Sequence, residues 1–264
     1  MKRSLAMIAG LALAATGLLS SCDSSSSTSS DGGGDSSATI PWNTSITYGT
    51  LKDSRDNQTY RTVKIGTQTW MAENLNYKVD SSWWYTGLDY SLPDTTLPGG
   101  FDSTDDATAK GAKYGLLYTW ASAMGFADSC NRKSCSTQVA AKHRGVCPAG
   151  WHLPSYEEWT VLFKPTMGDS LDGEDSTGAD YMATKGWEGV RGLDRFGFRA
   201  VPAGDRTPGK AKSFENAGRE AGWVSTSETS PSTFKTYDIL SEGWVRHYTT
   251  GNKPYGWSVR CLQD

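Results

Sequence analysis

The sequence lacks an excess of basic residues and the short motifs that mark common enzymes. Its 26 Lys and Arg are outnumbered by 29 Asp and Glu, and no basic run interleaves with aromatic residues, so nucleic-acid binding has no electrostatic support. It has only three histidines, and His143, His152 and His247 do not have the spacing of metal ligands. The Gly-x-Ser-x-Gly elbow of serine hydrolases is absent as well. We therefore expect no catalytic residue, no metal and no nucleic-acid partner.

Long apolar runs are scarce too. The N-terminal run Leu5–Leu19 has 15 uncharged residues, fewer than the roughly 20 that a bilayer-spanning helix needs. Two basic residues precede it and small residues follow it, which is the pattern of a signal peptide over residues 1–21. The end of this segment, Leu19-Ser20-Ser21-Cys22, resembles the bacterial lipobox.

The lipobox resemblance implies that a signal peptidase cuts before Cys22, which then carries lipid at the mature N-terminus. Two or three acyl chains anchor a protein stably to a membrane. The alternative is an ordinary cleavage site beside an incidental cysteine, which would leave an odd thiol in an oxidising compartment. We expect a lipid-anchored protein of the bacterial cell envelope, at the outer membrane or the cell surface, whose membrane contact is this lipid.

One globular domain is expected, because 264 residues can bury one good core without requiring two large domains. Residues 23–39 consist of Ser, Thr, Gly, Asp and one Ala, a composition with no apolar surface to bury. We assign residues 22–45 to a flexible tether and 46–264 to the domain. Residues 80–110 are rich in Gly, Pro, Ser, Thr and Asp, which predicts a long surface insertion.

The composition favours an α+β fold with short strands. The chain has 11 Trp, 12 Tyr, 7 Phe and 29 Gly, as is typical of many short strands and turns. Gln58–Ile65 and Gln68–Met71 are β-prone runs on either side of a Gly-Thr break, and they predict a hairpin. Further strands are expected at residues 116–118, 196–201, 222–226, 244–248 and 257–262.

Two helices are expected. One follows Thr119 in an uncharged run that is too short to cross a membrane. The other begins at a capping box, in which Ser155 caps the helix and Glu158 reaches back to the Ser155 amide. Its apolar face is formed by Trp159, Leu162 and Phe163. Residues 165–168 then end this helix.

Seven motifs in a fixed order carry a family resemblance. They are Asp56–Tyr60, Val63–Tyr77, Lys113–Trp120, Cys147–Ser155, Phe198–Gly204, Trp223–Glu228 and Ser258–Cys261. This set closely resembles the Fibrobacter succinogenes major paralogous domain, over about residues 50 to 264. The resemblance implies a single C-type-lectin-like domain, related to the formylglycine-generating enzymes, with short twisted antiparallel strands, about two helices and long loops. Because the family has no established activity, the resemblance implies a fold more than a function.

Four cysteines remain once Cys22 carries lipid. They are Cys130, Cys135, Cys147 and Cys261, and an even number in an oxidising compartment allows three pairings. Lectin-like folds bring the C-terminal strand against the segment that leads into a helix, so the resemblance implies that Cys147 pairs with Cys261. Cys130 and Cys135 would then close a short loop between them.

The spacing of Cys130 and Cys135 is also that of the copper-binding pair in formylglycine-generating enzymes. Those enzymes have a Leu-Pro box that is similar to His152–Trp159, and their cysteine pair follows the box, whereas here it precedes the box. We therefore expect a structural disulfide and no cofactor, with a copper-dependent oxidase as the competing function.

Calcium is the one cofactor that the sequence does not exclude. An acidic loop contains Asp169, Asp172, Glu174, Asp175 and Asp180. These residues do not follow the spacing of an EF-hand, and a solvated loop is the expected interpretation.

Aromatic residues outside the expected core are the remaining sign of function. Trp83, Trp84 and Tyr85 lie in the polar insertion, where flat rings can stack on sugar faces, although packing onto the domain is the alternative. The next candidates are Trp244, Tyr248 and Tyr255. We expect a non-catalytic surface lipoprotein that binds polysaccharide, plant fibre or another extracellular partner. An envelope scaffold with only protein partners is the further alternative.

Overall fold

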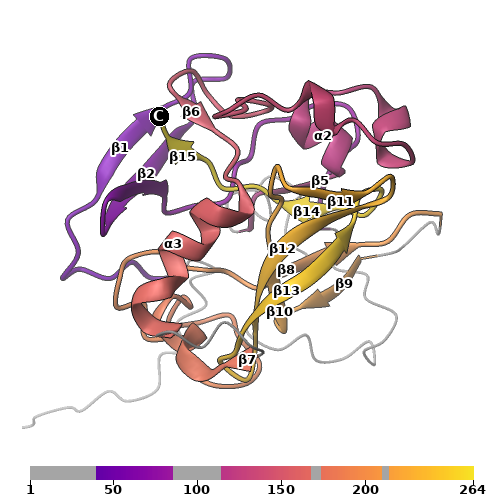
Figure 1. Cartoon of the computed structure of the whole chain (residues 1–264). Coiled ribbons are helices and arrows are strands. Elements are labelled where there is room, and N and C mark those ends of the chain that lie inside the picture. The colour runs from indigo at the N-terminus through magenta and orange to yellow at the C-terminus, as the bar shows by residue number, and fades with distance from the viewer. Residues whose placement is uncertain (1–39, 86–113, 168–173, 210–213) are drawn as a thin grey trace, which may run out of the picture. The chain divides into compact units, whose positions relative to one another are not determined.

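Short strands in separate antiparallel sheets form most of the fold (Figure 1). The computed structural model describes residues 40–85, 114–167, 174–209 and 214–264. These residues contain two α-helices and several antiparallel sheets, so the expected α+β class is confirmed. The predicted signal peptide, the predicted lipid site Cys22, most of the predicted tether and most of the predicted insertion lie outside the described residues.

The first sheet joins the N-terminal and C-terminal parts of the domain. Its order is β1 (Gly49–Lys52), β2 (Thr59–Ile65), β3 (Gln68–Met71), β15 (Leu262–Gln263) and β6 (Trp151–His152). The expected hairpin is confirmed as β2 and β3, with Gly66 in the turn at a φ of 59° that glycine adopts without strain. Strand β15 pairs with both β3 and β6, which places the C-terminus beside β6 (Figure 1).

Two long strands form the centre of the second sheet. These are β12 (Thr233–Leu240) and β13 (Val245–Asn252), flanked by β10 (Glu220–Gly222), β11 (Glu228–Ser230) and β7 (Glu174–Asp175). The third sheet contains β14 (Trp257–Ser258), β5 (Leu116–Tyr118) and β4 (Ser82–Trp84), and β8 (Ala203–Arg206) pairs with β9 (Phe214–Ala217). The strands expected at 116–118 and 244–248 are therefore confirmed as β5 and β13.

The run at 196–201 is not a strand, contrary to the prediction. Gly197 and Arg199 have φ values of 70° and 53°, and such left-handed residues interrupt an extended chain. Of residues 222–226, only the first lies in a strand. The strand expected at 257–262 is divided into β14 and the beginning of β15.

Both expected helices are present. Helix α2 (Trp120–Met124) begins at Thr119, whose hydroxyl accepts from the Ser122 amide at 3.2 Å, and ends at Gly125 with a φ of 69°. Short 3-10 helices follow at Asp128–Asn131, Ser136–Gln138 and Ser176–Asp180.

Helix α3 (Tyr156–Met167) confirms the capping box, and it continues through Pro165, which lies inside the helix. The Ser155 hydroxyl accepts from the Glu158 amide at 3.2 Å, and the Glu158 carboxylate accepts from the Ser155 amide at 2.8 Å. Within the described ranges, no helix has the length and apolar character needed to span a membrane.

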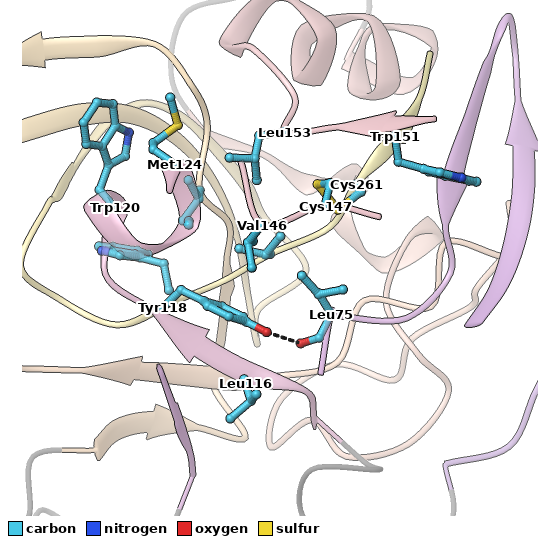
Figure 2. Packing of buried hydrophobic residues seen from close by; sticks show 14 of the residues in the cluster. Leu75, Leu116, Tyr118, Trp120, Met124, Val146, Cys147, Trp151, Leu153 and Cys261 are labelled. Carbon is cyan, nitrogen blue, oxygen red and sulfur yellow. Dashed lines mark hydrogen bonds between the residues drawn. A yellow bond between two sulfur atoms is a disulfide. The ribbon is translucent and has the colours of Figure 1, made fainter. Parts of the chain in front are cut away.

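One part of the core contains α2 and the long-range disulfide (Figure 2). The sulfurs of Cys147 and Cys261 are 2.04 Å apart, among buried side chains that include Trp120. The Tyr118 hydroxyl donates to the Leu75 carbonyl at 3.3 Å. Cys130 and Cys135 form the second disulfide, so both expected pairings are confirmed.

A second part of the core lies under α3 and consists mainly of aromatic rings. The expected apolar face of α3 is buried, and the Trp159 ring lies 4.6 Å from the Trp70 ring and 5.4 Å from the Trp223 ring. Stacked and tilted pairs at these distances stabilise a core by about 0.5–1.5 kcal/mol beyond their buried area.

The packed chain begins earlier than the expected boundary at residue 46. Ile40 is 4% exposed, and its carbonyl accepts from the Arg199 guanidinium at 2.6 Å. The Trp42 ring lies between the guanidinium groups of Arg61 and Arg199, at 4.1 and 4.0 Å from its centroid. Residues 40–45 therefore belong to the folded domain.

Candidate functional site

The structure separates the three aromatic residues that are neighbours in the sequence. Ser82–Trp84 form β4, which pairs with β5, so the prediction that Trp83 and Trp84 lie on a polar loop is wrong. Side chains alternate between the two faces of a strand. Trp83 and Tyr85 accordingly pack on one core cluster, and Trp84 packs on another.

Trp83 and Tyr85 have packing roles. Tyr85 is 2% exposed, and its ring centroid lies 5.3 Å from that of Phe214. The guanidinium of Arg206 lies 3.8 Å from the Trp83 ring centroid and covers that ring. Trp84 lines a groove among the described residues.

The groove beside Trp84 has a volume of about 530 Å³. Its lining residues come from the loop before β2, from the chain after β3 and from β4: Asp56, Gln58, Asn76, Tyr77, Lys78 and Trp84. We call this hollow the Trp84 groove. Its size falls in the range of small-molecule binding sites.

A network of amide groups fixes the polar wall of the Trp84 groove. The Gln58 amide donates to the Asp56 carboxylate at 2.8 Å and to the Asn76 carbonyl at 2.9 Å. The Asn76 side chain donates to Gln58 at 3.4 Å and accepts from the Trp84 indole at 2.9 Å. These bonds orient the donors and acceptors before any ligand arrives.

Tyr77 is held from two sides. Its carbonyl accepts from the Tyr118 hydroxyl at 2.7 Å, and the Arg55 guanidinium lies 3.8 Å from its ring centroid. Arg55 is itself paired with Asp53 at 2.6 Å. Although burial acts against it, the Arg55 contact holds the pKa of Asp53 below its ordinary value, so this carboxylate stays charged and keeps Arg55 in place.

The charges at the Trp84 groove balance. Asp56 supplies one carboxylate, and Lys78 supplies one ammonium group, which lies 5.1 Å from the Trp84 ring centroid. Burial lowers the pKa of Lys78. The lining residues therefore offer a ligand aromatic rings, amide groups and one charge of each sign.

The comparisons with known proteins identify the family. The family model of the Fibrobacter succinogenes major domain matches residues 63–263. The chain belongs to this family. Among curated proteins and among solved structures, nothing matches the chain. Four residues of the Trp84 groove lie within the matched range of this Fibrobacter succinogenes major domain, namely Asn76, Tyr77, Lys78 and Trp84. Asp56 and Gln58 precede that range.

Apart from Trp84, the groove residues of this family member were not among the site residues predicted from the sequence. Gln58, Asn76 and Tyr77 lie in the motifs that carry the family resemblance, where they have no periodicity or spacing that indicates a ligand. The available signal was an aromatic residue beside amide side chains, at the ends of the predicted hairpin. Only the folded chain brings them next to β4.

None of the other aromatic candidates is among the described lining residues of the Trp84 groove. Trp244 is 39% exposed just before β13. Tyr255 is partly buried against the α2 core cluster. Tyr248 lies on β13, and its side chain is outside what the structure describes.

His152 occupies a second, polar hollow of about 290 Å³. Its two ring nitrogens contact the carboxylates of Asp264 at 2.7 Å and Glu158 at 3.0 Å. Burial opposes the charged form, but these hydrogen bonds outweigh it and raise the pKa of His152. Both nitrogens are engaged, so this histidine holds α3 and the C-terminal end together.

The described residues contain no group of three or more His, Cys, Asp and Glu side chains suited to a metal ion. The sulfurs of Cys130 and Cys135 are bonded to each other, so a copper-dependent oxidase would first require reduction of this bond. Of the acidic loop, Asp169 and Asp172 lie outside the described residues, and Asp180 pairs with Arg195 at 3.0 Å.

Proposed function

We propose that this protein binds an extracellular polysaccharide through the Trp84 groove, without catalysing a reaction. The observation that carries the proposal is an aromatic ring beside amide groups that are already oriented by one another. Sugar rings have apolar C–H faces and polar hydroxyl edges. The indole of Trp84 fits the first, and the Asp56 carboxylate and the Asn76 amide fit the second. Gln58 positions these two groups, because both of its side-chain N–H groups already donate to Asp56 and Asn76.

The binding of a single groove need not be tight. The proposed lipid on Cys22 would place many copies on one bacterial surface, where they contact one polysaccharide together. Linked copies raise the overall avidity without any new contact. A non-catalytic surface lipoprotein with a shallow groove is therefore consistent with adhesion to a glycan or to plant fibre.

A binding screen on glycans and insoluble plant fibre tests this proposal. We expect the wild-type protein to be retained on at least one polysaccharide and the Trp84→Ala variant to lose most of that retention. Trp244→Ala is the matched control, because it removes a partly exposed tryptophan outside the groove. Loss of retention in Trp244→Ala with full retention in Trp84→Ala would place the binding site at Trp244 and overturn the proposal.

A further inference from the structure

A second groove of about 430 Å³ lies beside α2. Its lining residues come from the turn before β4, from the first turn of α2 and from the loop that follows α2: Val79, Asp80, Ser81, Thr119, Ala121, Ser122, Gly125, Phe126 and Asp128. We call it the Phe126 groove. Asp80 and Ser81 lie at the start of the predicted insertion, and none of the lining residues was a predicted ligand-binding residue.

The two grooves adjoin along the chain. Lys78 lines the Trp84 groove and Val79 lines the Phe126 groove, and the Cα atoms of consecutive residues are about 3.8 Å apart. A turn joins this segment to β4, and Ser81 has a φ of 55° there. The Ser82 hydroxyl donates to the Val79 carbonyl at 2.6 Å and accepts from its amide at 3.1 Å.

This turn is fixed against α2. The Ser81 carbonyl accepts from the Thr119 amide at 3.3 Å and from the Ser122 hydroxyl at 2.9 Å. This turn, which lies between the lining segments of the two grooves in the chain, is therefore held by backbone and side-chain hydrogen bonds. A ligand that crosses it meets a surface that is already ordered, which lowers the entropic cost of binding.

The Phe126 groove repeats the chemistry of the Trp84 groove with a different charge. Its aromatic ring, Phe126, is supported by Trp120 and His143 at centroid distances of 5.8 and 5.0 Å. The charged groups among its described lining residues are the carboxylates of Asp80 and Asp128. Asp128 pairs with Arg132, outside this lining, at 3.7 Å, and an exposed ion pair of this kind is weak. Carboxylates accept hydrogen bonds from hydroxyls and repel anions.

We infer that the Phe126 groove is a second subsite of the same glycan site, so that the recognised ligand is an extended chain of uncharged sugars. This inference rests on the proposed function of the Trp84 groove. One sugar segment stacks on Trp84, the chain crosses the turn at Val79, and a later segment meets Phe126 and donates hydroxyls to Asp80 and Asp128. Polyuronates and sulfated glycans are disfavoured by these two carboxylates.

A length series tests the inference on the detergent-solubilised full chain. The probes are cello-, xylo- and manno-oligosaccharides of two to six sugars, with oligogalacturonides of the same lengths as the anionic comparison. In at least one uncharged series, we expect Kd to fall about tenfold or more from the disaccharide to the hexasaccharide. Oligogalacturonides should bind more weakly than uncharged chains of equal length.

Variants separate this inference from the proposed function. Trp84→Ala should weaken every length, whereas Phe126→Ala and Asp128→Ala should return the hexasaccharide to the affinity of the disaccharide and leave the disaccharide unchanged. Glu157→Ala is the matched control for Asp128→Ala, because it removes an exposed carboxylate outside both grooves. Replacing Asp80 and Asp128 by Lys should bring the affinity for oligogalacturonides up to that for uncharged chains.

Equal affinity for the disaccharide and the hexasaccharide, with loss in Trp84→Ala, would overturn the second subsite and leave the Trp84 groove standing. Tighter binding of oligogalacturonides by the wild-type protein would overturn the assignment of uncharged sugars. If no oligosaccharide binds at any length, the proposed function fails and this inference fails with it.

Discussion

Trp83, Trp84 and Tyr85 are neighbours in the sequence, yet the two-residue period of β4 gives them different surroundings. Tyr85 and Trp83 pack against the cluster that contains Phe214, and Trp84 faces the groove with Asn76. These different surroundings depend on the register in which β4 pairs with β5. Shifting β4 by a residue would bury Trp84 and expose its two neighbours.

Single substitutions at the end of β4 and at the residue that follows it should therefore have unequal effects on stability. Tyr85→Ala removes a ring that is 2% exposed, which should lower the free energy of unfolding by about 3–5 kcal/mol. Trp84→Ala should cost clearly less, because that side chain is half-buried at the groove. Urea denaturation of both variants measures this order, and a larger loss in Trp84→Ala would contradict the register.

His152 should make the stability of the domain depend on pH. Its raised pKa means that its contribution is fully present below about pH 6.5, the ordinary value for histidine, and is lost as the pH rises through the folded-state pKa. The same contact lowers the pKa of Glu158, although burial acts in the opposite direction. The contribution of Glu158 to the free energy of unfolding is present above its ordinary pKa of 4.5 and is lost as the pH falls through its lowered pKa.

The test compares wild type with His152→Gln. We expect the variant to lose more free energy of unfolding at about pH 5.5 than at about pH 8.5, because the imidazolium interacts with both Glu158 and Asp264. Urea denaturation at the two pH values gives this difference. A loss of the same size at both values would show that the charge of His152 contributes nothing.

Among the structural elements, β15 depends on a covalent link. Cys147 and Cys261 are separated by 114 residues, and they connect the segment before β6 to the residue before β15. In the chain-entropy model such a loop contributes about 5 kcal/mol, whereas the five-residue separation of Cys130 and Cys135 contributes about 2 kcal/mol.

Replacing both cysteines of a pair by Ser should reproduce this order. The Cys147→Ser, Cys261→Ser variant should melt well below the Cys130→Ser, Cys135→Ser variant, and both should melt below wild type. Thermal denaturation followed by circular dichroism measures the three midpoints. Equal midpoints for the two variants would contradict the dominant role assigned to the long loop.

The elements differ in how far the sequence could predict them. The β2–β3 hairpin and the capping box of α3 are local, so their turn and cap residues were sufficient. Strand β4 could not be predicted, because its partner β5 lies more than 30 residues away in the chain and its flanking residues are polar. The same long-range pairing creates the groove, which is why only Trp84 among its lining residues was a candidate.

The run 196–201 has strand-forming residues, but the left-handed conformation of Arg199 prevents a strand there.

The whole molecule has a folded domain that begins at about Ile40. The lipid anchor N-terminal to it stays a prediction. Arg199 holds Ile40 and, together with Arg61, holds Trp42, so these residues belong to the packed domain. The proposed arrangement is a lipid on Cys22 that anchors a domain carrying the two grooves.

The anchor has its own test. Cys22→Ser should abolish labelling by a radioactive fatty acid and leave the unprocessed precursor, since the lipid is attached to this sulfur before cleavage. Wild-type protein analysed in parallel is the control. Equal labelling of the mutant and the wild-type protein would rule out Cys22 as the lipid site.

The central claim is that the Trp84 groove holds the sugar. Its most direct measurement is an equilibrium depletion isotherm of wild type, Trp84→Ala and Trp244→Ala on the insoluble polysaccharide that best retains the wild-type protein. The account predicts that Trp84→Ala raises Kd about tenfold or more with a folded spectrum and that Trp244→Ala matches wild type. An unchanged Kd in folded Trp84→Ala would contradict it.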